Sequence, residues 1–318
     1  MLAWPGYAQP EVVQAFERLT GAQVALTVID SDTALWQKIS QPGQHYDVWA
    51  INTAELQRCI TAALVAPIDL AQIPNTTQQL PRFRNLAGIA GLVHQQQVFG
   101  IPYTYAEMGL IYDRQQVKPA PQSITALWDP RWAGKVLLYN GASHNFSLAA
   151  QSLGLPSPFA IGSTQWQSAV DKLIALRRNA LGFCSQPEES VEWFKRKKAA
   201  LMFANYGSQQ LQMLKAAGVD AGYVVPKEGA LAWLDVWAVA RNSPNRALAH
   251  QWINHLLSPT AAHALLSSQG LAHTLTESAE LQGRDRLVWL EPVEDTRRRE
   301  TLWRRIYSGD SAARTLAP

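Results

Sequence analysis

The stretch from Tyr223 to Ala240 reads YVVPKEGALAWLDVWAVA, and its run after Glu228 places one carboxylate, Asp235, between two tryptophans among otherwise apolar residues. The composition of the run predicts a strand. An Asp inside such a strand loses hydration on folding, so it needs a buried partner or a charged ligand to stay ionised. Trp233 lies two residues earlier and therefore on the same face of the strand. Two interpretations follow: Trp233 and Asp235 line a cation-binding cleft, or Asp235 caps a turn at the end of a strand.

Outward from this stretch, strand and helix signals alternate along the chain. The alternation favours an α/β fold with a largely parallel sheet. Helices are expected at 11–19, 33–39, 53–64, from near 143, and at 165–181, 188–198, 209–217, 247–257 and 259–268, and strands at 23–29, 46–51, 98–105, 108–112, 135–139 and 200–204.

The length of 318 residues exceeds a typical single core, so two compact lobes are expected. Hydrophobic residues make up 47% and charged residues 17%, which supplies enough apolar material for two cores and excludes a disordered chain. The net charge is only +3. The basic runs Lys195–Lys198 and Arg297–Arg299 fall in predicted helices, so we interpret them as solvated rather than as nucleic-acid contacts.

No stretch approaches the roughly 20 consecutive apolar residues of a membrane span, and the N-terminus lacks a basic region followed by an apolar core. The helix signal Gln9-Pro10-Glu11 leaves room for a first strand of only a few residues. We therefore expect that upstream sequence, such as a signal peptide, was removed or misassigned. Cys59 and Cys184 are expected to be two free, mostly buried thiols, since a disulfide between them would lock two lobes together.

Six pieces of sequence, in this order, resemble one family of binding proteins. They are AWPGYAQPEVVQAFERLTGAQV (3–24), YDVWAINTAELQRCITAALVAPID (46–69), FGIPYTYAEMGLIYD (99–113), LWDPRWAGKVLL (127–138), AGYVVPKEGALAWLDVWAVARNSPNRALAHQWINHLLSP (221–259) and LEPVEDTRRRETLWRRIYSG (290–309). The chain resembles the extracellular solute-binding proteins of ABC importers, in the group related to the spermidine- and putrescine-binding proteins.

This resemblance implies a two-lobed, type II periplasmic-binding-protein fold with the ligand in the cleft between the lobes. The chain would cross between lobes near 103–108 and again near 235. Lobe one would comprise 1–103 and 236–272, and lobe two 104–235 and 273–318. The resemblance further implies a periplasmic monomer that closes over a small molecule by a hinge motion and presents the closed form to an ABC permease in the membrane.

The resemblance also implies which residues bind the ligand. In the polyamine binders that this chain resembles, a carboxylate after a tryptophan grips an amine, and here that pair is Asp235 with Trp233. The N-terminal loop keeps both aromatic residues but has Pro5-Gly6 where such binders carry an acid. The expected ligand-binding residues are Asp235, Trp233, Tyr7, Trp4, Asn52, Tyr105, Glu107, Ser143, His144, Asn205 and Tyr206.

Two ligand classes stay open. Desolvating each ammonium of a spermidine without a carboxylate is costly, so the missing acids argue against a long polyamine. Glu107 either supplies a second carboxylate for a short diamine or is a solvent-exposed hinge acid. A helix that begins at Asn140–Ser143, with Ser143 as its N-cap, presents N–H donors beside His144, which suits an anionic group. With Asp235, that helix would favour a small zwitterion such as an ω-amino acid or an aminophosphonate.

An enzyme on the same fold is a third interpretation. Gly141–Asn145 follows a strand and opens a helix as a nucleophile elbow does, but Asn145 stands where that motif needs Gly. The seven histidines form no HExxH pattern, the two cysteines form no metal pattern, and no glycine-rich phosphate loop occurs. The sequence thus predicts a binding protein without metal or cofactor. A ligand-sensing module of a regulator would need an attached DNA-binding or membrane segment.

Overall fold

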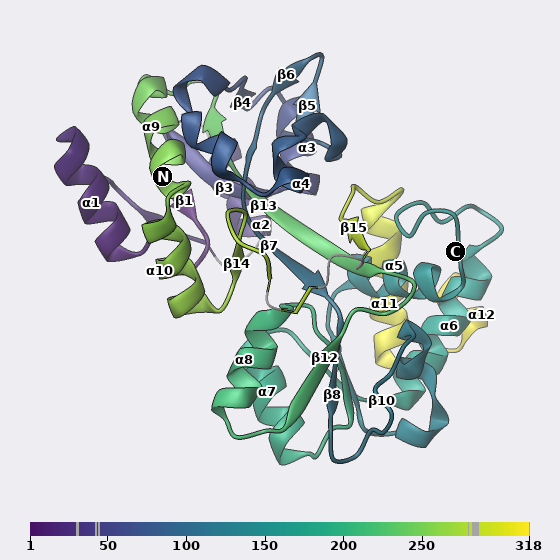
Figure 1. The fold of residues 1–318 in the computed structure, drawn as a ribbon. Coiled ribbons are helices and arrows are strands. Elements are labelled where there is room, and N and C mark those ends of the chain that lie inside the picture. The colour runs from purple at the N-terminus through teal and green to yellow at the C-terminus, as the bar shows by residue number, and fades with distance from the viewer. Residues whose placement is uncertain (30–31, 42, 44, 279, 282–285, 318) are drawn as a thin grey trace. The chain divides into compact units, whose positions relative to one another are not determined.

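The computed structural model describes residues 1–29, 32–41, 43, 45–278, 280–281 and 286–317 (Figure 1). The chain divides into two compact units. Unit 1 comprises Met1–Ala106, Trp233–Ala279 and Trp289–Glu291, and unit 2 comprises Glu107–Ala232, Glu280–Val288 and Pro292–Pro318. The lobes implied by the resemblance are defined by closure around a ligand, so their boundaries stay a prediction.

The larger sheet lies mostly in unit 1. Its strand order is β14-β7-β13-β3-β1-β2, and β4 and β15 also pair with β13. Strand β1 runs parallel to β2 and β3, whereas β13 runs antiparallel to β3 and β4, and β14 antiparallel to β7. The strands are β1 (Leu2–Ala3), β2 (Thr27–Val28), β3 (Val48–Asn52), β4 (Val65–Ala66), β7 (Ile101–Met108), β13 (Ala230–Ala240), β14 (Ala272–His273) and β15 (Leu287–Trp289). The chain passes into unit 2 within β7 and returns within β13.

The helices of unit 1 begin and end at the residues that local chemistry favours. Helix α1 has Pro10 in its first turn and ends at Gly21 in the left-handed conformation, and α10 starts behind Ser258, whose side chain accepts from the Ala261 N–H. The core centres on Trp237, which packs edge-to-face on Trp252. The helices are α1 (Pro10–Thr20), α2 (Asp32–Ser40), α3 (Thr53–Thr61), α4 (Pro81–Arg84), α9 (Arg246–Leu256) and α10 (Pro259–Gln269), with 3₁₀ turns η1 (Leu70–Gln72), η2 (Pro74–Gln78) and η3 (Leu86–Gly88) and a hairpin of β5 (Val93–His94) and β6 (Gln97–Val98).

Unit 2 contains a five-stranded sheet in the order β10-β9-β11-β8-β12. Strands β10 and β11 run parallel to β9, whereas β8 is antiparallel to both β11 and β12. The strands are β8 (Leu110–Asp113), β9 (Val136–Tyr139), β10 (Ala180–Cys184), β11 (Leu201–Phe203) and β12 (Ala221–Val224). The parallel strands β9 and β11 end in polar segments that lead into helices, which is where open α/β sheets place ligands.

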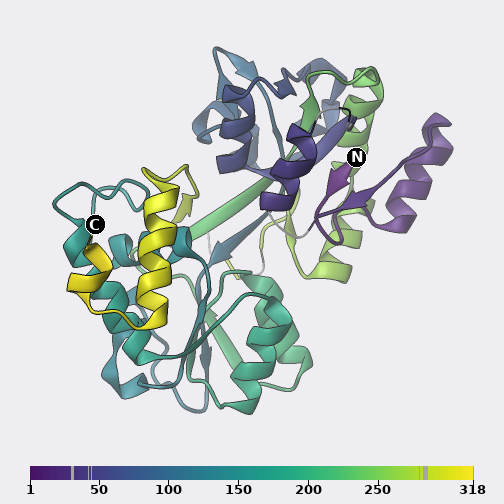
Figure 2. The same ribbon diagram turned by 180° about the vertical axis from the view of Figure 1, so that it is seen from behind.

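In the described part of unit 2, six α-helices contribute to its covering layers. Helices α11 and α12, yellow in Figure 2, lie against α6, and α11 also lies against α5. Ile111, Leu137, Met202 and Leu211 form part of a buried cluster between the sheet and helices α7 and α8. The helices are α5 (Ala142–Ser152), α6 (Trp166–Asn179), α7 (Pro187–Arg196), α8 (Ser208–Ala216), α11 (Thr296–Ser308) and α12 (Ala312–Leu316), with 3₁₀ turns η4 (Ile124–Trp128) and η5 (Pro130–Trp132).

The α/β architecture is confirmed, but three details of the prediction are wrong. Both sheets are mixed rather than largely parallel, because the long strand β13 and the strand β8 run against their neighbours. The helix expected at 165–181 ends at Asn179, and residues 180–184 form β10. The strand expected at 23–29 is limited to Thr27–Val28.

Three other expectations can be compared with the structure. Cys59 and Cys184 are free and buried, one in each unit, as expected. Lys195–Lys198 is exposed at the end of α7, which confirms the solvated interpretation of that run. Within the described ranges, no helix is both long and apolar enough to cross a membrane.

Candidate ligand-binding site

Asp235 is a buried carboxylate in the middle of β13. Its side chain is only 8% exposed. In the antiparallel register of β13 with β3, Asp235 pairs with Asn52, so the two side chains lie next to each other on one face of the sheet. The Tyr7 hydroxyl donates a hydrogen bond of 2.5 Å to Oδ2 of Asp235. The interpretation of Asp235 as a cap at a strand end is wrong, because β13 continues for five residues beyond it.

The environment of Asp235 makes its charge adjustable near neutral pH. Burial, together with the negative charge of Asp32, raises the pKa of Asp235 to about 7, against the opposite effect of the Tyr7 hydrogen bond. The pKa of Tyr7 is in turn raised well above its usual value by burial and by the Asp235 charge. Tyr7 therefore stays a neutral donor, and Asp235 is a carboxylate that a nearby cation would strongly stabilise.

The N-terminal loop fixes the position of Tyr7. The Tyr7 backbone N–H bonds to the Trp4 carbonyl, and the Tyr103 hydroxyl donates to the Tyr7 carbonyl, each at 3.2 Å. The Tyr7 and Tyr103 rings meet edge-to-face, 5.5 Å apart. Gly6 has φ +79°, and a Cβ there would collide with the side chain of Gln269, so this turn strongly favours glycine. The positions of Trp4 and Tyr7 in this loop thus depend on Gly6, which lies between them.

Asn52 connects this site to a second acid. Its side-chain oxygen accepts from the Glu55 N–H at 2.9 Å, which makes Asn52 the N-cap of α3. Its Nδ2 donates to Oδ1 of Asp32, also at 2.9 Å. Partial desolvation and the charge of Glu55 raise the pKa of Asp32 to about 6, although the side chain keeps contact with solvent. Sequence reasoning missed Asp32; an acid at the start of a helix directly after a strand was the available signal.

The other aromatic residues expected at the site differ in exposure. Trp4 and Trp233 are half-buried, and the indole Nε1 of Trp4 is buried without a hydrogen-bond acceptor among the described residues. Tyr105 is fully buried within unit 1, where its hydroxyl bonds to the Thr276 carbonyl and the Ser278 N–H. Trp4 and Trp233 therefore have surface to offer a ligand in this structure, whereas Tyr105 packs in the interior.

Glu107 belongs to unit 2 and lies near the end of β7. Its side chain is fully buried, so the interpretation as a solvent-exposed hinge acid is wrong. The reason is local, because all eight residues of β7 are buried. The Glu107 backbone carbonyl accepts from the Tyr223 hydroxyl at 2.7 Å, which ties β7 to β12.

The start of α5 holds two more of the expected residues. The N-cap is Gly141, so Ser143 is the second helical residue and its interpretation as an N-cap is wrong. His144 packs edge-to-face on Tyr139, 5.2 Å between ring centroids. Burial and the charge of Arg299 lower the pKa of His144 to about 4, so the imidazole is neutral at pH 7. Gly141 supplies no side chain that could occupy the N–H donors of the first turn.

Asn205 and Tyr206 follow β11 and lie beside the same tyrosine. Asn205 is 7% exposed, and the Tyr206 hydroxyl donates to the Ser185 carbonyl at 2.8 Å. Tyr139, Asn205 and Tyr206 line a cavity of about 10 Å³, which has room for about one water molecule. The expected residues of unit 2 that follow β9 and β11 thus share one neighbourhood around Tyr139.

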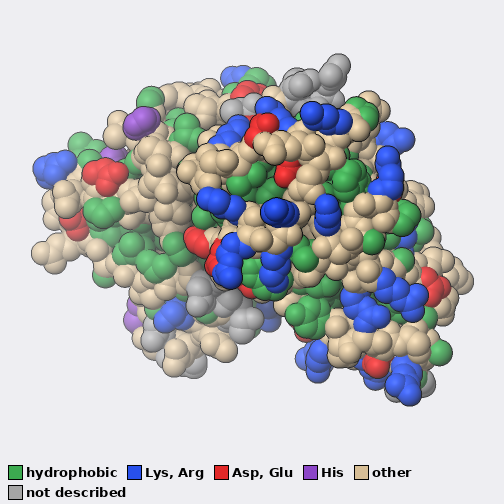
Figure 3. All heavy atoms as spheres, turned by 90° about the horizontal axis from the view of Figure 1, so that it is seen from below, with side chains coloured by type: hydrophobic (Ala, Val, Ile, Leu, Met, Phe, Trp, Pro, Cys, Tyr) green, Lys and Arg blue, Asp and Glu red, His purple; other side chains and the backbone are tan. Residues whose placement is uncertain are grey.

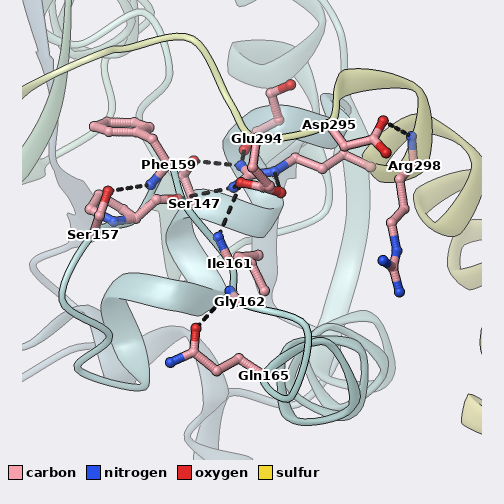
Figure 4. A network of polar contacts seen from close by, with 12 residues as sticks. Ser147, Ser157, Phe159, Ile161, Gly162, Gln165, Glu294, Asp295 and Arg298 are labelled. Carbon is pink, nitrogen blue, oxygen red and sulfur yellow. Dashed lines mark hydrogen bonds and ion pairs between the residues drawn. The ribbon is translucent and has the colours of Figure 1, made fainter.

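Arg299 was missed by the sequence analysis, which treated it as part of a solvated cluster. That interpretation is wrong, because Arg299 is fully buried. Its guanidinium binds both carboxylate oxygens of Glu294, at 2.9 and 2.7 Å, the Ser147 hydroxyl at 2.9 Å, and the carbonyls of Ser143 and Pro158. Figure 4 shows the Glu294 part of this network. All five N–H donors are used, so Arg299 anchors α11 to the start of α5 and has none left for a ligand.

The two units carry opposite net charge. Unit 1 contains 7 Lys and Arg against 10 Asp and Glu, a net charge of −3, and unit 2 contains 21 against 15, a net charge of +6. Lys and Arg side chains are spread over much of the face shown in Figure 3, with fewer Asp and Glu between them. The unit that contains Asp235 is therefore the one whose overall field favours a cation.

The family of the chain can now be stated from comparison with known proteins. Residues 11–287 match the family of bacterial extracellular solute-binding proteins. The chain belongs to this family. The resemblance inferred from the six sequence pieces is thereby confirmed.

The relatives of this solute-binding protein include polyamine binders. It is 26% identical to the putrescine-binding periplasmic protein PotF of Escherichia coli K12 over 297 residues, which cover 88% of this chain and 80% of the relative. It is 23% identical to the spermidine/putrescine-binding periplasmic protein 1 of Haemophilus influenzae, over 85% of this chain and 73% of the relative. These proteins carry periplasmic and polyamine-binding names.

Solved structures confirm the expected two-lobed binding-protein fold. The spermidine/putrescine ABC transporter substrate-binding protein PotD of Streptococcus pneumoniae superposes with a TM-score of 0.77 at 24% identity, covering 96% of this chain and 98% of the other. The structure of the Atu4243–GABA receptor superposes with a TM-score of 0.74 at 17% identity, covering 96% of this chain and 95% of the other. Proteins of this fold thus carry different ligand names, and the fold alone does not choose the ligand of this solute-binding protein.

Proposed function

We propose that this solute-binding protein captures a small amine-bearing ligand of the putrescine type in the periplasm and delivers it to an ABC permease. The observation that carries the proposal is the buried carboxylate of Asp235, whose single hydrogen bond within the described part of the chain comes from a neutral phenol. The names of the relatives support the same ligand class. The protein acts by binding and closure, without turnover.

The energetics of Asp235 favour an ammonium ligand. A carboxylate this deeply buried is costly to ionise without a positive charge beside it, and the raised pKa is the expression of that cost. An ammonium group would restore the ionised form. Trp233 and Trp4, which are half-buried, supply aromatic surface, and each face in contact with the cation contributes roughly 0.5 to 2 kcal/mol.

A second candidate is a small zwitterion, such as an ω-amino acid or an aminophosphonate. The observation in its favour is the first turn of α5, whose N–H donors have no capping side chain and suit an anion. Side-chain charge does not assist there, because His144 is neutral and Arg299 is neutralised by Glu294. The amine end of a zwitterion would bind Asp235 in the same way as that of a diamine.

The test is a ligand screen by thermal shift, followed by calorimetric titration of the wild type and of Asp235→Asn. Putrescine, spermidine, ω-amino acids and aminophosphonates separate the two candidates. A ligand at 100 times its Kd stabilises the folded protein by about 2.7 kcal/mol, which a thermal shift resolves. Asp235→Asn should lower amine affinity by orders of magnitude, and near-normal binding by this variant would refute the proposed role.

A further inference from the structure

Asp32 lies where a second carboxylate of the amine site would be placed. Asn52 and Asp235 are directly opposed across β3 and β13, and residues in that relation have their side chains on the same face, with Cβ atoms roughly 5 Å apart. The amide of Asn52 reaches Asp32 at 2.9 Å. Asn52 therefore stands between two carboxylates, one from β13 and one from the first turn of α2.

Neither carboxylate has a cation of its own. Among the described residues, no Lys or Arg forms an ion pair with Asp32 or Asp235. The nearest basic residue along α3, Arg58, pairs with Glu55 at 3.4 Å and stacks on the Trp36 ring at 3.5 Å. Asp32 bonds to the Asn52 amide, and Asp235 lies opposite Asn52 in the strand register. Two acids placed in this way, without a counter-ion among the described residues, are suited to share a cationic ligand.

The buried member of the pair has unused hydrogen-bonding capacity. Asp235 is more than nine-tenths buried, yet within the described part of the chain it accepts only the Tyr7 hydrogen bond, whereas a carboxylate has about four lone-pair sites. Because the described residues leave most of this acceptor capacity unused and the residue keeps a small exposed area, Asp235 can receive a donor from outside.

We propose that Asp32 is a second ligand-binding carboxylate, and that Asp32 and Asp235 together select a primary ammonium group. This inference rests on the proposed function. A primary ammonium has three N–H donors, enough for both carboxylates at once, whereas each methyl group on the nitrogen removes one donor and adds bulk. The pair thus distinguishes a primary amine from an N-methylated amine of equal charge.

The ordinary role of an acid at this position provides the matched control. An acid in the first turn complements the helix dipole, and Glu11 has that role in α1 just as Asp32 has it in α2. The structure shows no hydrogen bond or ion pair of the Glu11 side chain within the described residues. Glu11→Gln therefore removes the same charge from unit 1 and the same kind of helix-dipole interaction, and Glu11 is not among the charges that shift the pKa of Asp235.

The experiment is calorimetric titration of putrescine and of its N,N,N′,N′-tetramethyl derivative into the wild type, Asp32→Asn, Glu11→Gln and Asp235→Asn. Losing one hydrogen bond to a charged group costs about 1.5 to 3 kcal/mol, so Asp32→Asn should weaken putrescine binding roughly 10- to 150-fold. It should also narrow the preference for putrescine over the tetramethyl derivative. Glu11→Gln should change neither quantity by more than about twofold.

The outcomes separate this inference from the proposed function. Unchanged putrescine affinity and unchanged preference in a folded Asp32→Asn protein, with binding lost in Asp235→Asn, would overturn the role of Asp32 and leave the proposed function standing. A wild type that binds no putrescine would overturn the proposed putrescine function itself. If Asp32→Asn does not fold, Asp32→Ser keeps a helix-starting side chain and gives the same readout.

Discussion

Amine binding should depend strongly on pH between 5 and 8, because Asp235, the carboxylate that we propose binds the amine, titrates in that range. Burial raises the pKa of Asp235 to about 7, and only the ionised form attracts an ammonium group. A primary alkyl amine stays protonated throughout, since its pKa resembles the value of about 10.4 for lysine. The protein rather than the ligand therefore sets the pH dependence.

The magnitude follows from the fraction of Asp235 that is ionised. With a pKa of about 7, that fraction is about 1% at pH 5, half at pH 7 and about 90% at pH 8. Amine affinity should then rise roughly 50-fold from pH 5 to pH 7 and about twofold more by pH 8. Asp32, whose pKa is raised to about 6, should make the amine affinity fall more steeply as the pH drops below 6.

The assay is titration calorimetry with putrescine at several pH values, each in two buffers of different ionisation enthalpy. The buffer dependence reports proton release, which should be about 0.9 proton per ligand at pH 6 and about 0.1 at pH 8 for Asp235 alone. Tyr7→Phe removes a hydrogen bond that lowers the pKa of Asp235, so the pH at which amine affinity is half of its maximum should rise. An affinity that changes less than twofold between pH 5 and pH 7, without proton release, would refute the reasoning.

The same titration has the opposite effect on the stability of the unliganded protein. The folded-state pKa of Asp235 lies above the unfolded value of 3.8, so the folded protein binds more protons between these pH values. The free energy of unfolding should therefore fall as pH rises from about 4 to 7, by up to about 4 kcal/mol from this group. Added amine should reverse the loss by stabilising the ionised carboxylate.

Two further predictions concern the rest of the chain. Arg299→Met should lower the free energy of unfolding by about 3 to 5 kcal/mol in a denaturant titration, because it leaves buried acceptors and the Glu294 carboxylate without their cation. The control Arg297→Met changes an exposed position and should lower it by less than about 0.5 kcal/mol. Equal losses in the two variants would contradict this prediction. Burial raises the pKa of Cys59 and of Cys184 to about 12, so roughly one thiol in ten thousand is ionised at pH 8. Ellman's reagent should therefore label the native protein slowly and both thiols rapidly in guanidinium, and a fast native reaction would show an accessible thiol.

Most helices could be predicted from the sequence, because hydrophobic periodicity marks the helix and local signals mark its ends. The helix expected at 259–268 is found at Pro259–Gln269, between the Ser258 cap and Gly270. Where such signals are absent the prediction failed, as at residues 180–184, which continue the apolar pattern of α6 without a Gly or Pro between helix and strand. Strand direction also could not be predicted, because it depends on which distant strands pair.

In the candidate site, too, contacts between residues that are distant in the sequence could not be predicted. Asp235 could be found because a carboxylate in an apolar strand is locally anomalous, but its hydrogen-bond partner Tyr7 lies 228 residues away. Asp32 and Arg299 look like an ordinary helix-start acid and part of a solvated basic run. Their roles come from tertiary contacts, with Asn52 in one case and with Glu294 in the other.

The charge distribution within each unit constrains the ligand further than the family does. In unit 1, two carboxylates without counter-ions favour a cation. In unit 2, the start of α5 combines a neutral His144 with an Arg299 that is already neutralised, so it offers dipoles rather than charge. An ammonium group there would meet these N–H donors, which is unfavourable, whereas a carboxylate or a hydroxyl would be accepted. The first turn of α5, taken by itself, therefore favours the anionic end of a zwitterion over a second ammonium group.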